Sequence, residues 1–238
     1  MFMSRYIKRG HGDRYADGIT VTPRRMQKAE IIAETIGRLL SQQSGLVIVD
    51  FGCADGAIPV MLLRLSIGAS IAHITGITLL NYNDLLEKKS HTHSHFNRII
   101  ADLEMDLDNV TLPWGQCDIV IATAFFHYLT HPEVAFAHAR RLLKPGGYLL
   151  AGMPARWVLF LRRCGIPGIL PPNNYIRHIK TLNDWRTLAV VNGLSEVSRQ
   201  AVQWFGCAFT AAVEKWMRHN RLLKSLGSNY LVIYRRID

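Results

Sequence analysis

The amino-acid sequence predicts an α/β protein with a doubly wound, mostly parallel sheet of seven strands. Up to residue 153, strand-like and helix-like segments alternate, as they do where right-handed crossovers build a parallel sheet covered on both faces. The first strand is apolar on both faces, which is typical of a buried parallel strand. Two strand-like segments near the C-terminus bring the number of predicted strands to seven.

The composition is that of an ordinary globular protein. The chain has 238 residues, of which 49% are hydrophobic and 19% charged, enough for one α/β domain with a substantial core. The sequence contains no uncharged apolar run of ~18 residues, so we expect no transmembrane helix. The first residues lack the apolar core of a signal peptide. The four cysteines are far apart and form no metal-type pair, which suits a reducing cytoplasm. We therefore expect a cytoplasmic protein.

The net charge of +10 is unevenly distributed along the chain. Residues 1–30 carry seven Lys or Arg against three Asp or Glu, residues 31–150 carry eight against eleven, and residues 151–238 carry thirteen against four. Such basic flanks indicate an anionic partner, which is an acidic substrate, a membrane surface or nucleic acid. Charges that serve only solubility would give the same pattern.

The first half of the chain begins with a predicted helix from Pro23, with Thr22 as its cap, because proline fits the first helical position. Its apolar residues recur at helical spacing: Ile31, Ile32, Ile36, Leu39 and Leu40. The predicted segments that follow are a strand at 46–51, a helix at 57–67 stopped by Gly68, a strand at 72–79, a helix at 83–89 and a strand at 98–103.

The second half continues the alternation and then departs from it. The predicted segments are a strand at 117–123, a helix from Pro132, a Lys-Pro-Gly-Gly turn at 144–147 and a strand at 147–153. Residues 154–180 interrupt the pattern with several prolines and read as an insertion. A helix ending near Gly193 and strands at 195–202 and 229–236 complete the chain.

The turn "DFGCADG" at residues 50–56 joins the first strand to the next helix. Glycines let a backbone approach a ligand closely, and a helix start offers free amides. The spacing is D-x-G-x-x-x-G, which differs from the G-x-G-x-x-G of dinucleotide-binding loops, and no Gly-Lys-Ser/Thr of a P-loop follows. Packing of the strand against the helix would also explain the glycines.

This turn resembles the first motif of the class I S-adenosylmethionine-dependent methyltransferases, which have a Rossmann-like fold. Three later stretches agree with that family in order and spacing: "IIADLE", "CDIVIATAFFHYL" and "RRLLKPGGYLLAG". The resemblance covers about residues 30–153, and the last two strands are similar to the C-terminal antiparallel hairpin that closes this fold. The C-terminal part is loosely similar to MetW-type methyltransferase-like proteins, with a tryptophan and basic residues after the fifth strand.

The resemblance implies a single methyltransferase domain over residues 1–238 that uses S-adenosyl-L-methionine and no metal. Its predicted parts are an N-terminal basic segment (1–29), a cofactor-binding core (30–153), an acceptor-side insertion (154–180) and a C-terminal helix with strands (181–238). Three histidines in a connecting loop, His91, His93 and His95, have no acidic partner motif nearby and are not assigned to a metal.

The resemblance also assigns residues to the two ends of the cofactor. The turn after the first strand would line the methionine part, through Asp50, Gly52, Cys53, Ala54 and Gly56. Of these, Asp50 would help to hold the ammonium group, and Thr123 would lie under the methionyl chain. Asp102 would accept a hydrogen bond from the adenine amino group, with Leu103 packed nearby; a turn-capping role is the alternative for Asp102.

The second strand departs from the pattern of most such enzymes, in which it ends in an acid that takes both ribose hydroxyls. Thr78 stands in that place. The cyclopropane-fatty-acid synthase group also has a Thr-Leu pair there, and by that likeness Thr78, Leu79 and Asn83 would hold the ribose. Neutral groups make weaker hydrogen bonds than a carboxylate, so we expect a modest cofactor affinity. The missing acid also argues against a nicotinamide-dependent oxidoreductase.

Methyl transfer needs mainly alignment of the acceptor, and a base where the acceptor is a hydroxyl or an ammonium group. His127, with Tyr128 beside it, is the best-placed candidate for that base, and a structural loop histidine is the alternative.

The insertion at 154–180 mixes apolar side chains with arginines, including Arg162 and Arg163. This mixture suits a small or lipid-like, amphipathic acceptor with negative charge, or peripheral contact with an anionic membrane. Nucleic acid is not expected, because no basic run with interleaved aromatic residues extends beyond this segment. The alternative function is a non-catalytic, methyltransferase-like binding protein that supports a partner enzyme.

Overall fold

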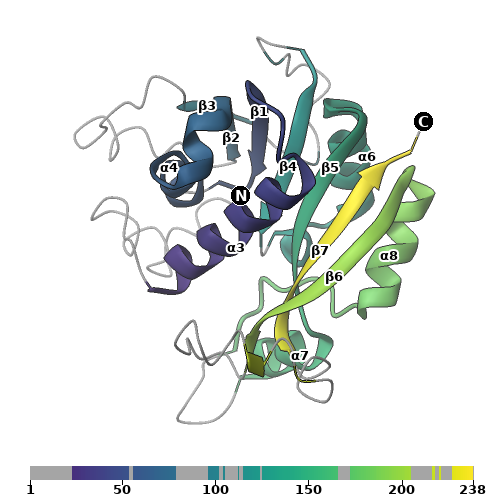
Figure 1. Cartoon of the computed structure of the whole chain (residues 1–238). Coiled ribbons are helices and arrows are strands. Elements are labelled where there is room, and N and C mark those ends of the chain that lie inside the picture. Colours follow the sequence, from purple (N-terminus) through teal and green to yellow (C-terminus); the bar gives the residue numbers. More distant parts are fainter. Residues whose placement is uncertain are drawn as a thin grey trace. The chain divides into compact units, whose positions relative to one another are not determined.

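The computed structural model describes residues 23–53, 56–78, 96–101, 104, 112, 115–123, 125–165, 172–204, 216–217, 220 and 227–237. The chain divides into two compact units, Met1–Asp102 and Leu103–Asp238. We describe each unit by itself (Figure 1). The predicted cap Thr22 and the predicted helix at 83–89 lie outside the described residues.

The first unit has a parallel set of three strands in the order β3-β2-β1. Its elements are α3 (Pro23–Leu39), β1 (Leu46–Phe51), α4 (Ala57–Arg64), the 3-10 helix η1 (Ser66–Ser70), β2 (Ile71–Thr78) and β3 (Phe96–Ile100). All six residues of β1 are buried, as its apolar run predicts. The apolar stripe of α3 is buried at Ile31, Ile32 and Ile36, whereas Leu39 and Leu40 are half-buried.

The helix after β1 ends earlier than predicted. α4 stops at Arg64, and Gly68 lies within η1, where its N–H donates to the Leu65 carbonyl at 2.8 Å. A Cβ at Gly68 would lie 2.2 Å from the carbonyl oxygen of Leu63. The glycine is therefore needed because the 3-10 turn folds back on the helix, and its role as the residue that stops the helix was wrong.

The second unit places its strands in the order β4-β5-β7-β6, with β4 parallel to β5 and the last three strands antiparallel. Its strands are β4 (Cys117–Thr123), β5 (Leu143–Pro154), β6 (Leu194–Trp204) and β7 (Gly227–Arg236). Its helices are the 3-10 helix η3 (Phe126–Tyr128), α6 (Pro132–Leu142), α7 (Arg156–Cys164) and α8 (Leu182–Val191). The described strands therefore confirm a mostly parallel sheet with a C-terminal antiparallel hairpin.

The Lys-Pro-Gly-Gly segment is part of β5, where a separate turn was predicted. The register shifts there, since Cys117 pairs with Leu143 but Ile119 pairs with Tyr148. Gly146 has a φ of +75°, which favours glycine. The ammonium group of Lys144 reaches back to the carboxylate of Asp118 at 2.7 Å. The segment is a bulge within β5, so the separate turn predicted at 144–147 was wrong.

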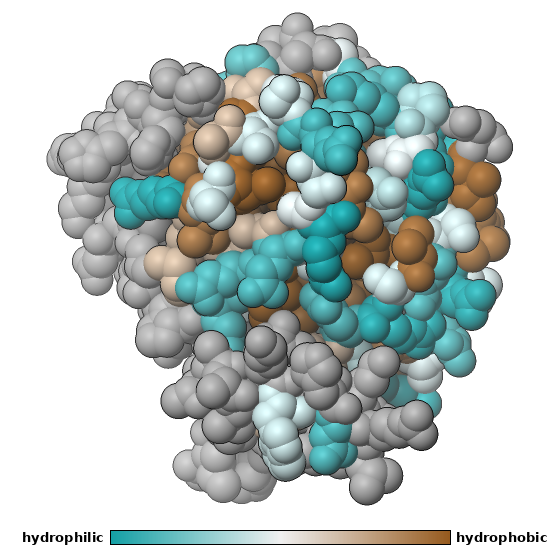
Figure 2. All heavy atoms as spheres, in the orientation of Figure 1, coloured by the Kyte–Doolittle hydropathy of each residue, from teal (hydrophilic) through white to brown (hydrophobic). Residues whose placement is uncertain are grey.

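No helix among the described residues is long and apolar enough to cross a membrane. Within the predicted insertion at 154–180, the structure forms α7 and an irregular segment that runs from residue 172 to the start of α8. The space-filling view shows hydrophobic residues between hydrophilic ones on one face of the molecule (Figure 2).

Candidate functional site

The turn after β1 is shaped by two glycines and a buried acid. Gly52 has a φ of +69° and Gly56, which precedes α4, has a φ of +76°. Both values lie in the left-handed region that non-glycine residues avoid. Asp50, near the end of β1, is only 2% exposed. The residue before α4, Gly56, has no side chain with which to cap the helix, so the turn combines a buried carboxylate with left-handed glycine backbone.

Main-chain hydrogen bonds fasten this turn to the neighbouring strand β2. The N–H groups of Gly52 and Cys53 both donate to the carbonyl of Ile77, at 2.8 and 3.2 Å. The next residue, Thr78, ends β2 and is 4% exposed. Its carbonyl accepts the N–H of Ala101 at 3.0 Å. The structure thus brings five predicted cofactor residues to the carboxyl ends of β1 and β2: Asp50, Gly52, Cys53, Gly56 and Thr78.

One residue that shapes this turn was missed from the sequence. Gly76 lies within β2, opposite Asp50 in the parallel register. A Cβ on Gly76 would lie 2.5 Å from Sγ of Cys53 and 3.2 Å from the ring of Phe96. The side chain of Cys53 occupies the space that a larger residue would need. A glycine inside a strand often marks such a close approach, and that signal was present in the sequence.

The other residues predicted to contact the cofactor belong to the second unit or lie outside the described residues. Thr123 ends β4 in the second unit, is half-buried and pairs with Gly152 of β5. Five residues lie outside the described residues, so their roles stay predictions: Ala54, Leu79, Asn83, Asp102 and Leu103.

The loop after β4 carries the candidate base. His127 lies in η3 and is 1% exposed, with its ring 4.0 Å from the ring of Tyr128 between centroids. The preceding residue, Phe126, is fully buried and stacks on Phe136 of α6 at 4.3 Å. Phe126 also approaches Trp185 of α8. The loop is therefore anchored by aromatic side chains on two helices.

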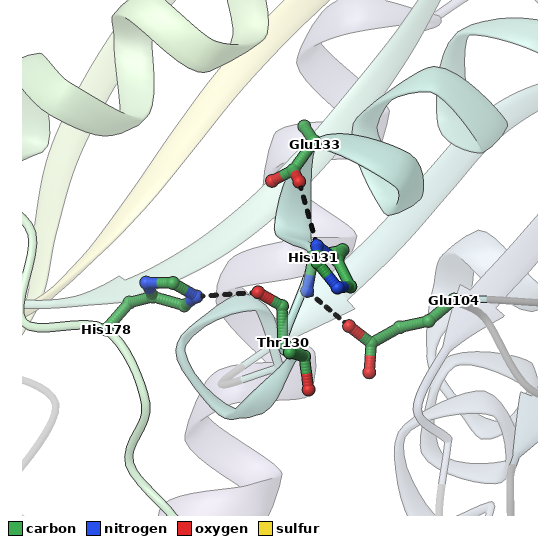
Figure 3. A network of polar contacts seen from close by, with 5 residues as sticks. All are labelled: Glu104, Thr130, His131, Glu133 and His178. Atoms are coloured by element: carbon green, nitrogen blue, oxygen red, sulfur yellow. Dashed lines mark hydrogen bonds and ion pairs between the residues drawn. The ribbon is translucent and has the colours of Figure 1, made fainter.

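A segment from the predicted insertion holds the same loop through hydrogen bonds. The N–H groups of Arg177 and His178 donate to the carbonyl of His127, at 2.9 and 3.3 Å. Nε2 of His178 is 3.1 Å from the carbonyl of Thr130, and the close-up shows the His178 ring turned toward it (Figure 3). Since a carbonyl only accepts, this contact requires a proton on Nε2. His178 was not among the predicted site residues.

Two carboxylates hold the end of the loop where α6 begins. The N–H of His131 donates to Oε1 of Glu104, and Nδ1 of His131 lies 3.3 Å from Oε1 of Glu133 (Figure 3). Glu104 comes from the segment before β4, so residues distant in sequence meet here. Glu104 was missed because nothing in its local pattern marks it.

Among the described residues, no group of three or more His, Cys, Asp or Glu side chains is placed to hold a metal ion. The histidines at 91, 93 and 95 lie outside those residues.

Comparison with known proteins identifies the central part of the chain. Residues 49–151 match the family described as Methyltransferase domain. The chain carries a methyltransferase domain. Its first matched residue lies in β1 and its last in β5, so the match covers the turn, Thr78 and the loop of His127. The predicted recognition as a class I methyltransferase is confirmed by this match and by the fold.

The relatives of this methyltransferase domain are distant in sequence. A malonyl-acyl-carrier-protein O-methyltransferase from Paenibacillus sp. (strain JDR-2) is 26% identical over 103 residues, which is 43% of this chain and 37% of the relative. The chain thus aligns with about a third of the curated relative's length.

Two solved structures share the fold. One is the 1,6-didemethyltoxoflavin-N1-methyltransferase of Burkholderia thailandensis with 1,6-didemethyltoxoflavin and S-adenosylhomocysteine, with a TM-score of 0.60 at 16% identity, over 99% of this chain and 87% of that chain. The other is an S-adenosylmethionine dependent methyltransferase from Mesorhizobium loti, with a TM-score of 0.59 at 17% identity, over 87% of this chain and all of that chain.

The methyltransferase domain implies S-adenosylmethionine as methyl donor, and the residues of the first unit fit that group. The buried carboxylate of Asp50 suits a cationic ammonium group, because an opposite charge offsets the desolvation of a buried acid. Gly52 is exposed and has no side chain that would obstruct a methionyl chain. The hydroxyl of Thr78 both donates and accepts hydrogen bonds, as ribose hydroxyls require.

Proposed function

We propose that this protein transfers the methyl group of S-adenosylmethionine to a small or amphipathic acceptor that carries negative charge. The observation that carries the proposal is the turn after β1, where the buried carboxylate of Asp50 and two left-handed glycines are fastened beside the end of β2. The match to the methyltransferase domain supports the same cofactor.

The residues of the site have mainly to bind the donor and to align it with the acceptor, because S-adenosylmethionine when bound supplies an already electrophilic methyl group. Asp50 would accept hydrogen bonds from the ammonium group. Thr78 would hold the ribose. The glycines would leave space for the methionyl chain.

His127 would take the proton that a hydroxyl or ammonium acceptor loses, with Tyr128 as its neighbour. The burial of His127 would keep such a base away from bulk water, and the hydrogen bonds from Arg177 and His178 fix its backbone. Fixed geometry supports a role in alignment.

An anionic acceptor is supported by the basic charge of residues 151–238. In α7, Arg163 is exposed and Arg162 is half-buried, and no acidic residue is present in the helix. The relative from Paenibacillus is named for a malonyl group, whose carboxylate is of the same chemical class. Arg162 and Arg163 would steer the acceptor and leave the cofactor untouched.

The cofactor is tested by thermal unfolding of the full chain with S-adenosylmethionine, S-adenosylhomocysteine or NAD. A ligand that binds only the folded state raises the melting temperature, and we expect this from the first two ligands. Asp50→Asn should weaken S-adenosylmethionine binding about ten-fold, since the ammonium loses a charged acceptor. Asp118→Asn, which removes a carboxylate paired with Lys144, is the matched control. Stabilisation by NAD alone would contradict the proposal.

Transfer is tested by turnover of a methyl-labelled donor with a panel of carboxylic acids, acyl thioesters and their neutral analogues. We expect label in an anionic member of the panel, and less of it in the Arg162→Gln/Arg163→Gln variant at low salt, where charge steering is strongest. Binding of the donor without transfer to any acceptor would favour the non-catalytic alternative.

A further inference from the structure

The helix α7 has two apolar sides, and only one of them is buried. Val158 is 7% exposed and Leu159 is fully buried. On the other side, Trp157 is 43% exposed, Phe160 55% and Leu161 37%, and Cys164 is also exposed. Residues 157, 160, 161 and 164 are spaced i, i+3, i+4 and i+7, so they form one continuous line along the helix. We call these four residues the outer stripe.

Cationic side chains flank the outer stripe. Arg156 and Arg163 are exposed and seven residues apart, so they lie on the same side of the helix, next to Phe160. No residue of α7 is acidic. Large apolar side chains bordered by arginines on a helix face match the pattern of helices that lie in the headgroup region of a membrane. Aromatic residues such as Trp157 are favoured at that depth.

The structure holds α7 firmly at both ends. Before the helix, the N–H of Ala155 donates to the carbonyl of Ser228 in β7 at 2.9 Å. Near its end, the carbonyl of Arg162 accepts the N–H of Asn173 at 2.8 Å. Asn173 belongs to the segment whose residues Arg177 and His178 hold the loop of His127. The outer stripe is therefore a rigid surface at the carboxyl end of β5, linked by a short segment to the candidate base.

We propose that the outer stripe of α7 docks this protein on the surface of an anionic lipid bilayer. The apolar side chains would enter the headgroup region, and Arg156 and Arg163 would contact acidic lipid headgroups. The inference rests on the proposed function in one respect: it takes the methyl acceptor to be an amphipathic molecule of that bilayer. A second copy of the chain is a poorer occupant, because a symmetric contact would bring the arginines of both copies together.

The test is co-sedimentation of the full chain with vesicles of phosphatidylcholine alone or with half phosphatidylglycerol. We expect binding to the anionic vesicles, weaker binding in 1 M salt, and at least ten-fold less binding to pure phosphatidylcholine. Trp157→Ser/Phe160→Ser should reduce binding about ten-fold or more, because two of the apolar anchors are lost. Arg156→Gln/Arg163→Gln should also reduce vesicle binding, and it should leave the fold unchanged because both side chains are exposed.

The matched control uses exposed apolar residues on another helix of the same unit. Val190 and Val191 of α8 are 51% and 80% exposed, and hydrophobic residues reach the surface over α8 in Figure 2. Val190→Ser/Val191→Ser should bind vesicles like the wild type. Absence of wild-type binding, or wild-type-like binding by both α7 variants, would overturn the proposal. Capture of the wild type in a dimer that both α7 variants abolish would also overturn it. Calorimetric titration with S-adenosylmethionine, without vesicles, tests the proposed function separately.

Discussion

The turn after β1 and the loop after β4 each carry candidate functional residues, but they are built differently. The turn depends on the backbone, with left-handed glycines at 52 and 56 and two N–H groups on one carbonyl of β2. The loop depends on side chains from distant segments, since Phe136, Trp185, His178 and Glu104 hold it.

The difference matters for what a sequence can reveal. A backbone-built turn needs glycine at fixed positions, so it leaves a short local motif. A loop held by distant side chains leaves none, because many residue types can pack or donate a hydrogen bond in such places. The two constructions should also respond differently to mutation. The turn should be disrupted by substitutions that add a side chain, and the loop by substitutions that remove one.

The largest effect is expected at Gly56, where a valine would need a φ of +76°. A β-branched residue is strained in that conformation, and its side chain would fill the space left for the methionyl chain. Gly56→Val should reduce the affinity for S-adenosylmethionine by about a hundred-fold or more, because the backbone of the turn could no longer approach the ligand closely. Calorimetric titration measures the affinity.

Gly45 supplies the matched control for backbone strain. Its φ is +73° and a Cβ there would meet nothing within 4 Å. Gly45→Val should destabilise the fold by about 1–2 kcal/mol, as expected for a left-handed residue, and should bind the cofactor normally. If both valine variants lost binding together, strain in the fold and not the turn itself would be responsible.

The second effect concerns Gly76, the glycine of β2 that makes room for Cys53. Gly76→Ala places a Cβ 2.5 Å from the sulfur of Cys53, and we expect a loss of about 1–3 kcal/mol in unfolding free energy, as for other overpacked cores. Urea denaturation measures this loss.

Cys53→Ala should recover part of the loss in the double variant, because it removes the sulfur. The alanine retains the Cβ of residue 53, which lies 3.0 Å from the new methyl group, so recovery should be incomplete. Additive effects of the two changes would mean that Gly76 does not support the turn through Cys53.

The sequence predicted the elements that have strong local patterns. Pro23 and Pro132 begin α3 and α6, and the apolar runs at 46–51 and 117–123 are strands. Gly68 and the Lys-Pro-Gly-Gly segment were misread, because a glycine signals a special backbone and not which one. Gly68 relieves a contact with the Leu63 carbonyl, and Gly146 forms a bulge within β5.

Among the candidate functional residues, the sequence marked those of the turn and the candidate base His127 but missed the residues that hold them. His178 is 51 residues from His127, and its contact with Thr130 arises only when the segment before α8 folds back. No local pattern encodes such a contact. Gly76 is an intermediate case, since a glycine within a strand pattern is visible but its partner Cys53 is not.

The third prediction removes a side chain that holds the loop. His178→Ala loses the hydrogen bond to the Thr130 carbonyl, although the main-chain bonds to His127 remain. A looser loop should lower turnover about ten-fold through misplacement of His127, with unchanged affinity for S-adenosylmethionine. Steady-state kinetics and titration measure the two quantities.

His131→Ala is the matched control for the third prediction. The side chain of His131 is 64% exposed and contacts Glu133, whereas its bond to Glu104 uses the main chain. Turnover should stay close to that of the wild type. Equal losses in both variants would mean that the loss of turnover is not specific to the His178 contact.

The smallest effect is expected at the start of α8, where Thr181 and Asp184 form a reciprocal cap. The Thr181 N–H donates to the Asp184 carboxylate at 2.7 Å, and the Asp184 N–H donates to the Thr181 hydroxyl at 3.1 Å. The hydrogen bond from the Thr181 N–H is the main cause that lowers the pKa of Asp184 below its ordinary 3.8. Thr181→Ala should cost about 1 kcal/mol of stability at neutral pH, measured by urea denaturation.

Asp184→Asn should reveal the pH dependence of this cap. A carboxylate with a lowered pKa stabilises the folded state fully at pH values above the unfolded-state pKa, and this contribution is lost as the pH falls through the folded-state pKa. The difference in unfolding free energy between wild type and Asp184→Asn should therefore be constant at neutral pH and shrink below about pH 4. Thr187→Ala, which loses a hydroxyl bonded to the Asn183 carbonyl, should show a difference that does not change with pH. A constant difference for Asp184→Asn down to pH 2 would mean that the charge of the Asp184 carboxylate does not contribute to the stability of the cap.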